Sequence, residues 1–300
     1  MKHISNKHVF YAFSPENHPV ARVKQGELFS LQTYDCFQGQ IQTESDHLDT
    51  LDWDHVNPAT GPVFIEGTKP GDILKIDLLS VKVLNQAVVC AVPHEGVLGD
   101  QVTKMETAVL KYEDDYAVFK DKVRIPLHPM VGVIGVAPET GSVPNGTPGV
   151  HGGNMDCTEI GEGTSLYLKV GVEGALFGAG DMHAVMGDGE VVVTGAETAG
   201  ELVVKAIVVD MPELPTPFLS TSELVITIAS ASTTDEAAKT ATEMMADFLT
   251  HFAGLAMNDA AMLMSLVGNL KFCQIVDPQV TVRFEFPKWV LKTYGFELKD

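Results

Sequence analysis

The hydrophobic pattern of the first 230 residues is that of many short strands. Apolar and β-branched runs of strand length alternate with turns rich in Gly, Pro, Asn and Asp. The segment Ile73–Leu78 partly alternates apolar and polar residues, as an antiparallel strand with one solvated face should. No segment with helical periodicity separates the runs, so we expect a sandwich or barrel and not a doubly wound parallel sheet. The runs are Val63–Glu66, Ile73–Leu84, Val88–Val92, Val131–Ala137, Leu166–Val172, Val191–Thr194 and Leu202–Val209.

The pattern changes after the proline-rich segment Pro212–Pro217. Thr233 and Glu236 have the spacing of a capping box, which predicts a helix N-terminus. An apolar stripe then recurs at helical intervals, and Gly254 is placed to end the helix. The stripe consists of Ala237, Ala241, Met244, Phe248 and Phe252.

The rest of the C-terminal segment predicts a small α+β unit. We expect a second helix from Asn258 to Gly268, and strands at Leu224–Ala229, Phe272–Val276 and Val280–Phe286. The fold class is therefore mainly β with a C-terminal α+β part. We predict three parts: a β-sandwich body at 1–125, a β-rich site-bearing subdomain at 126–212, and the α+β unit at 213–300.

Composition and charge limit the partners. The chain is 45% hydrophobic and 20% charged, which is typical of a globular protein. Its formal charge of −20 argues against nucleic acid and against anionic membrane surfaces. The four cysteines have no short spacing, which favours reduced thiols over a disulfide framework or a zinc ribbon. We find no signal-peptide or membrane-spanning run and expect a cytoplasmic protein.

The candidate chemistry is concentrated in the block Gly178–Glu190. Asp181 and His183 lie two residues apart, so an extended strand places both on one face about 6.5–7 Å apart. Asp188 and Glu190 repeat this spacing. Carboxylates brought that close repel one another unless a proton or a cation intervenes, so the block predicts a metal site. Taken singly, each residue is better explained as a turn residue or an interior histidine, but turn chemistry does not require His183 or Glu190, so the set together favours a site.

Two further segments supply candidates. His151–Asp156 reads HGGNMD, with Asp156 as a metal ligand or base and Asn154 as an amide-recognition group. The alternative for this segment is an Asx-type turn with structural glycines. The acidic stretch Thr43–His55 is expected to be an exposed loop, from which Asp46 reaches the site across the fold. The sequence has neither a GxSxG nor an HExxH motif, so an activated water is the expected nucleophile.

At these residues the chain resembles the acetamidase/formamidase family. Four blocks carry the resemblance besides the HGGNMD segment: GDMHAVMGDGE at Gly180–Glu190, GALF at Gly174–Phe177, the long match at Gly61–Leu79, and the late strand that ends with Gln274–Asp277. Met182 stands where Gly is frequent in the family, and Met186 where Gln is frequent. Met186 in place of Gln removes a side-chain amide from the expected pocket, and this change bears on which substrate the pocket accepts.

The resemblance implies hydrolysis of short-chain amides to ammonia and a carboxylate. It also implies a jelly-roll-like β-sandwich, a β-barrel-like subdomain and assembly into oligomers. For this chemistry we predict that Asp156, Asp181 and His183, with Asp188 as a further ligand, bind a divalent metal. Zinc is our first choice, and manganese, magnesium or calcium are the alternatives. We predict Glu190 as the general base, with Asp46 and Asn154 as further catalytic residues and Gly152–Gly153 as N–H donors to the oxyanion.

Two other expectations concern function class and assembly. The rival function is non-enzymatic: a jelly-roll protein whose acidic loops hold a structural calcium or bind a small ligand.

The apolar stripe of the predicted C-terminal helix is flanked by further apolar residues. Together they form more apolar surface than one edge of a small α+β unit readily buries. We therefore expect a homo-oligomer, a dimer or tetramer, with the C-terminal unit at the contact.

Overall fold

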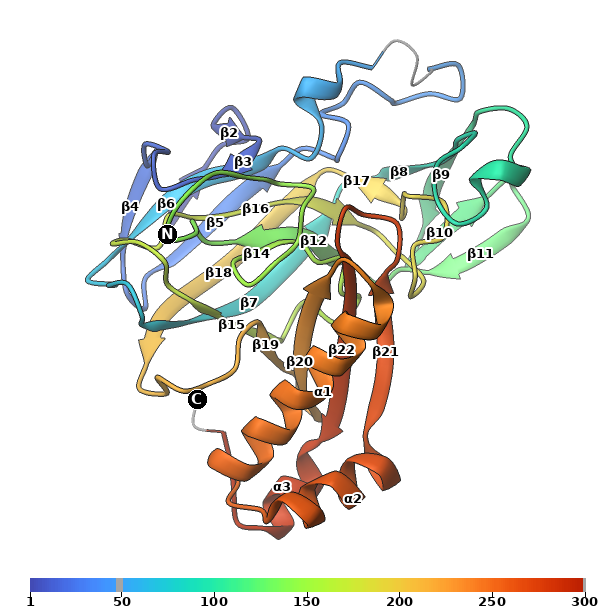
Figure 1. The fold of residues 1–300 in the computed structure, drawn as a ribbon. Coiled ribbons are helices and arrows are strands. Elements are labelled where there is room, and N and C mark those ends of the chain that lie inside the picture. The colour runs from blue at the N-terminus through green and yellow to red at the C-terminus, as the bar shows by residue number, and fades with distance from the viewer. Residues whose placement is uncertain (47–50, 299–300) are drawn as a thin grey trace.

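The computed structural model describes residues 1–46 and 51–298. The chain is mainly β: two large sheets fill the upper body, and one of them continues into the C-terminal part, where three α-helices lie (Figure 1). This confirms the predicted fold class. The jelly-roll and barrel topologies within the β body stay predictions.

The first sheet has nine strands drawn from the whole length of the chain. Its neighbours are antiparallel except for the first pair, which is parallel. Its strands in spatial order are β1 (Lys2–Ile4), β5 (Leu28–Thr33), β18 (Gly200–Val209), β7 (Ile73–Val83), β15 (Ser165–Lys169), β19 (Phe218–Ser220), β20 (Leu224–Ala231), β22 (Val280–Pro287) and β21 (Asn269–Gln274).

The second sheet has eleven strands and carries the residues singled out from the sequence. Its main path is β11 (Val123–Pro126), β10 (Tyr116–Phe119), β9 (Glu106–Glu113), β8 (Gln86–Ala91), β17 (Glu197–Thr198), β16 (Phe177–His183), β12 (Met130–Gly135) and β14 (Gly152–Asn154). Strand β6 (Ala59–Glu66) joins this sheet through β16, and β2 (Val9–Phe10) and β4 (Ala21–Lys24) pair with β6. A separate pair is formed by β3 (Ala12–Phe13) and β13 (Val143–Pro144).

The two large sheets share one hydrophobic core. On β18, Leu202, Val204 and Ala206 are buried while the residues between them are partly exposed, which is the alternation of a strand with one face inward. Phe29 of β5 meets Phe177 of β16 edge to face, with ring centroids 6.0 Å apart, and so joins the two sheets. The core fixes the orientation of β16, the central strand of the site.

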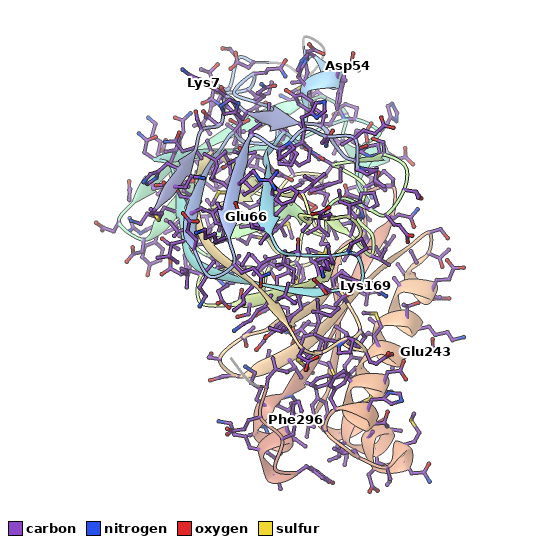
Figure 2. All side chains as sticks on the ribbon, turned by 90° about the vertical axis from the view of Figure 1, so that its left-hand side faces the viewer. Lys7, Asp54, Glu66, Lys169, Glu243 and Phe296 are labelled. Atoms are coloured by element: carbon purple, nitrogen blue, oxygen red, sulfur yellow. The ribbon has the colours of Figure 1, made fainter. Side chains whose placement is uncertain are left out.

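The C-terminal part has a second core beneath helix α1 (Thr234–His251). The helix covers one face of β20 and β22, with α2 (Met257–Val267) and α3 (Lys288–Thr293) at its far end (Figures 1 and 2). The Thr233 hydroxyl caps α1 by accepting the Glu236 backbone N–H, as predicted. The predicted stripe differs at two positions: Met245 and Leu249 are fully buried, whereas Met244 and Phe252 are only partly buried.

The three predicted parts share the nine-stranded sheet, and the first two also share the eleven-stranded sheet. The nine-stranded sheet takes strands from all three residue ranges, so the boundaries at 125 and 212 remain predictions. Within the described residues, no helix combines the length and apolar character that crossing a membrane requires.

Strand β21 and helix α2 leave an apolar surface exposed. Strand β21 is the last strand of its sheet, and Leu270 and Phe272 on it are 48% and 45% exposed. On α2, Met262 and Leu266 are 57% and 78% exposed. Apart from its end, where Gly189 bonds to Cys273 and Ile275, this edge strand also presents backbone groups that a second copy of the same strand can pair by two-fold symmetry. We therefore propose that a second copy of this chain covers this surface.

Light scattering at micromolar concentration is expected to give a multiple of the single-chain mass. Substitution Leu266→Glu should shift the protein toward the single chain, because the new charge would be buried in the contact. Leu84→Glu is the matched control, since Leu84 is 57% exposed at the β7–β8 turn. A wild-type protein that has the mass of one chain would refute the proposal.

Candidate functional site

The end of strand β16 brings Asp181 and His183 to one point. The strand is paired with β12 on one side and with β6 and β17 on the other, so its backbone is held in the middle of the sheet. His183 Nε2 lies 3.5 Å from Asp181 Oδ1, and both side chains are buried. The structure brings these two residues together, although Asp181, with a φ of 51°, leaves the extended conformation from which the contact was predicted.

Neighbouring strands add two carboxylates to the same imidazole. Asp156 follows β14, and its Oδ1 lies 3.9 Å from His183 Nε2. Glu197 stands opposite His183 in the β16–β17 pair, and its Oε2 lies 3.1 Å from the same nitrogen. Three buried carboxylates therefore surround one histidine nitrogen.

Two glycines make the space for these side chains. A Cβ at Gly132 on β12 would lie 2.4 Å from Asp156 Oδ1 and 3.0 Å from Asp181 Oδ2. A Cβ at Gly195 would lie 2.7 Å from His183 Nδ1. Any larger residue at either position would displace the cluster, so these glycines are part of the site.

The loop after β16 directs its two acidic residues to different places. Glu190 is 6% exposed and has a carboxylate oxygen within 4.8 Å of donor atoms of Asp156 and His183. Asp188 instead accepts two hydrogen bonds from Arg283, each 2.8 Å long. The structure thus places Glu190 in the cluster, and the prediction that Asp188 is a metal ligand is not supported. The two-residue spacing failed here because the loop is not an extended strand.

A cavity of about 190 Å³ opens onto the cluster. Its polar wall includes Asp181, Glu190 and Glu197 together with Asn154, whose Nδ2 donates a hydrogen bond of 2.9 Å to Asp277 Oδ2. The prediction that Asn154 belongs to the site is consistent with this position. The apolar wall consists of Phe37, Trp53, Val56, Val92, Val192 and Val193.

Neither the Asp46 carboxylate nor the Gly152 N–H is placed for the catalytic role predicted from the sequence. Asp46 Oδ2 accepts hydrogen bonds from the backbone N–H groups of Gln42 and Thr43, each 2.8 Å long, so its carboxylate closes a local turn. His47 and Asp49 of the same stretch lie outside the described residues. The Gly152 N–H donates to the Gly149 carbonyl at 3.1 Å and is not free for an oxyanion.

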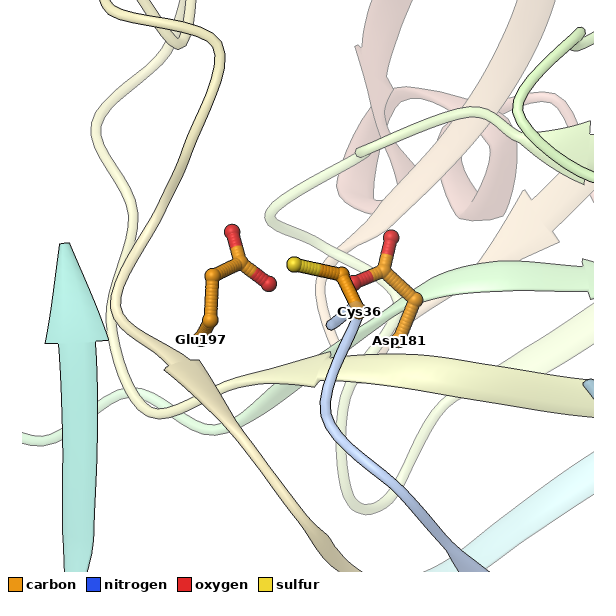
Figure 3. A group of neighbouring side chains, drawn as sticks. All are labelled: Cys36, Asp181 and Glu197. Carbon is orange, nitrogen blue, oxygen red and sulfur yellow. The ribbon is translucent and has the colours of Figure 1, made fainter. Parts of the chain in front are cut away.

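Sequence reasoning missed Cys36 and Asp277 as residues of the site. Cys36 follows β5, and its sulfur points toward the Glu197 carboxylate (Figure 3). Donor atoms of Cys36, Asp181 and Glu197 lie within 4.8 Å of one another. No motif links Cys36 to the acidic blocks, since the contact depends on the packing of the two sheets. Asp277 ends the segment Gln274–Asp277, which is part of the family resemblance, and this match was the one signal in the sequence that could have identified it.

Burial and mutual repulsion dominate the electrostatics. Burial raises the pKa of Asp156 and of Glu190 well above the usual range, and neighbouring carboxylates raise both further. Burial likewise raises the pKa of Glu197 to about 7 and that of Asp277 to about 8. Burial alone would lower the pKa of His183, but the facing carboxylates outweigh it and raise this pKa well above its usual value.

The cluster fits a divalent cation. Within the described residues, its buried donor atoms without a hydrogen-bond partner are Asp156 Oδ1 and Oδ2, Asp181 Oδ1, His183 Nδ1 and Nε2, and Glu197 Oε2. Buried polar atoms normally have partners, so such a group of orphaned donors around one point indicates a ligand. Carboxylates, an imidazole and a thiol are all donors for zinc.

Comparison with known proteins places the chain in a family. It belongs to the Acetamidase/Formamidase family, whose sequence profile matches residues 2–147 and 142–291. An acetamidase from Bacillus halodurans superposes with a TM-score of 0.96 and is 42% identical, covering 98% of this chain and 100% of that one. An acetamidase from Yersinia enterocolitica gives a TM-score of 0.91 at 28% identity, covering 97% and 92%.

Curated relatives are more distant. A formamidase from Methylophilus methylotrophus is 25% identical over 252 residues, or 64% of this chain and 61% of the relative. An acetamidase from Mycolicibacterium smegmatis is 24% identical over 251 residues, or 62% of each chain. The chain spans 60–62% of the length of the curated relatives it matches.

The crowded carboxylates predict an unusual pH dependence of stability. Glu197 and Asp277 hold protons in the folded state up to about pH 7 and 8, whereas the unfolded chain loses them near 4.5 and 3.8. Their stabilising contribution is therefore present at low pH and is lost as the pH rises through 7 and 8. Burial lowers the pKa of His151 to about 4. This histidine makes stability rise with pH, but only below about pH 6.5, where the unfolded chain binds its proton.

We expect the Tm of chelator-treated protein to fall between pH 6.5 and 8.5. Added Zn²⁺ should raise the Tm most at the alkaline end, because the cation competes with the protons. The variant Glu197→Gln should show a shallower fall. A Tm of the chelated wild type that is constant or rises over this range would contradict the assignment.

Proposed function

We propose that this protein hydrolyses short linear amides to ammonia and a carboxylate, using a divalent cation. The observation that carries the proposal is a cavity that opens onto the buried group of carboxylates around His183. Membership of the Acetamidase/Formamidase family, and the relatives named acetamidase and formamidase, support the same reaction.

We assign three residues as ligands of the cation: Asp156, Asp181 and His183. Zinc is the preferred ion, because an imidazole lies at the centre and the Cys36 thiol adjoins the Asp181 and Glu197 carboxylates. A bound divalent ion polarises a carbonyl and lowers the pKa of water from about 15.7 to about 7. Manganese, magnesium and calcium remain alternatives, which elemental analysis distinguishes.

The chain's own groups then handle the proton and the substrate. Glu190 faces the cavity, and a cation bound beside it would lower its pKa, so that it can take a proton from water and deliver it to the leaving nitrogen. Asn154 also lines the cavity, where its amide can hydrogen-bond the substrate amide. The nitrogen departs readily only after protonation, so one carboxyl group that accepts and then donates the proton serves both steps.

The size of the cavity favours small substrates. Its volume of about 190 Å³ is roughly six times the ~30 Å³ that one water occupies in the liquid. Such a space holds a short amide together with the attacking water. The walls of Phe37, Val56 and Val92 suit a small apolar acyl group.

The rival function, a structural calcium site in a non-enzymatic protein, fits the donors less well. Calcium takes six to eight oxygen ligands in proteins. Here the cluster includes a buried imidazole and a buried thiol, and it borders a cavity. Ammonia release from formamide and acetamide, measured with and without a chelator, separates the two functions. Release that depends on the metal supports the enzyme, and no release from any short amide supports the rival.

Glu190→Gln is expected to lower kcat by about 10²- to 10⁴-fold, the usual contribution of a general base. The fold and the metal content should stay intact, because the substitution is isosteric. Glu197→Gln is the matched variant: its carboxylate also faces His183, but its loss should act through the histidine. Near wild-type turnover in Glu190→Gln would end its role as base.

His183→Ala is expected to lower bound metal and activity together. Loss of a direct ligand should weaken binding at least as much as loss of a supporting partner, which costs about 10- to 100-fold in affinity. His151→Ala is the control, because His151 is also buried but lies outside the donor groups. Stoichiometric metal in purified His183→Ala would show that His183 is not a ligand.

A further inference from the structure

Arg283 on β22 is a buried cation held by several partners. Its side chain is 1% exposed, and its Nε donates a hydrogen bond of 2.8 Å to Glu285 Oε1. Its Nη1 donates to the Phe272 carbonyl at 2.9 Å and, with Nη2, binds the carboxylate of Asp188 in a two-pronged pair. This geometry fixes the orientation of both groups, because the guanidinium is planar and rigid.

Asp188 joins Arg283 to two segments of the candidate active site. Its Oδ1 also accepts a hydrogen bond of 2.9 Å from the Thr158 hydroxyl. Thr158 lies two residues after Asp156, and Asp188 lies two residues before Glu190. One carboxylate therefore ties together the segments that carry Asp156 and Glu190.

The backbone next to Asp188 needs this support. Gly189 and Glu190 have φ values of 102° and 48°, and a non-glycine residue adopts the second only when its surroundings hold it there. The Gly189 N–H donates to the Cys273 carbonyl at 2.8 Å, and the Gly189 carbonyl accepts the Ile275 N–H at 3.3 Å. The loop is thus docked on β21, beside the strand that carries Arg283.

The turn between β21 and β22 supplies a third carboxylate. Gln274 Oε1 accepts the backbone N–H groups of Val276 and Asp277 at 2.8 and 3.0 Å. Its Nε2 donates to Thr281 on β22, two residues before Arg283, at 3.2 Å. The same hairpin that carries Arg283 therefore also sets the position of Asp277 in the cavity wall.

We propose that Arg283 and Asp188 act as positioning residues that hold Asp156, Glu190 and Asp277 in register across the cavity. The proposal rests on the proposed amidase function. Neither positioning residue lines the cavity within the described part of the chain. They act through geometry, and a displacement of about 1 Å at a reacting group can cost about 10²-fold in rate.

The test compares Asp188→Asn and Arg283→Lys with Asp77→Asn. Asp77 is also a buried carboxylate, but its partners Lys75, Lys205 and Ser165 lie on β7, β18 and β15, outside the loop and the hairpin of the proposal. We expect both site variants to lose at least about tenfold in kcat with KM changed less than about twofold. Hydrogen exchange at residues 187–190 should quicken in both. Asp77→Asn should lose stability only, with kcat and exchange in this segment unchanged.

Unchanged kcat and unchanged exchange in Asp188→Asn would overturn the proposal, as would an equal loss of kcat in Asp77→Asn. If the Arg283 variant does not fold, Thr158→Val removes one hydrogen bond to Asp188 and should give the same pattern with a smaller amplitude. A wild type without amidase activity would instead refute the proposed function. The exchange measurement would still decide whether Arg283 and Asp188 order the loop.

Discussion

Mutual repulsion among buried carboxylates is the constraint on which the site depends. Asp156, Asp181 and Glu197 all approach His183 Nε2 within 4 Å, and water does not screen them because all are buried. In isolation such an arrangement opposes folding. It persists because strand pairing fixes each backbone position, and because a cation or protons can neutralise the charge. The chemistry we propose uses the same property, since charges that repel one another bind a cation tightly.

The fold meets this constraint by drawing the site from distant parts of the chain. Cys36 follows a strand of the first sheet, whereas Asp181 and Glu197 belong to the second. The C-terminal hairpin adds Asp277 and, through Arg283, holds the loop that carries Glu190. The C-terminal part is therefore more than an appended unit, because the cavity needs it to be complete.

Sequence reasoning succeeded where structure follows from local spacing. Most of the strands and the capped helix follow from periods of 2 and 3.6 residues. The predicted strand Val191–Thr194 is wrong, because this segment turns, and Asp181 meets His183 although its φ of 51° departs from an extended strand. Sequence reasoning failed where a contact spans the fold: the partner of Asp188 lies 95 residues away, and Cys36 reaches the site through sheet packing. Asp46 was assigned from acidic composition alone, and its carboxylate serves a turn.

The most direct test of the account is the metal content of the wild-type protein, measured by elemental analysis after purification without added metal and again after chelation. The account predicts a divalent cation in stoichiometric amount, amidase activity that is lost with it, and recovery of both on adding it back. Full amide hydrolysis by protein shown to contain no divalent cation would contradict the central claim.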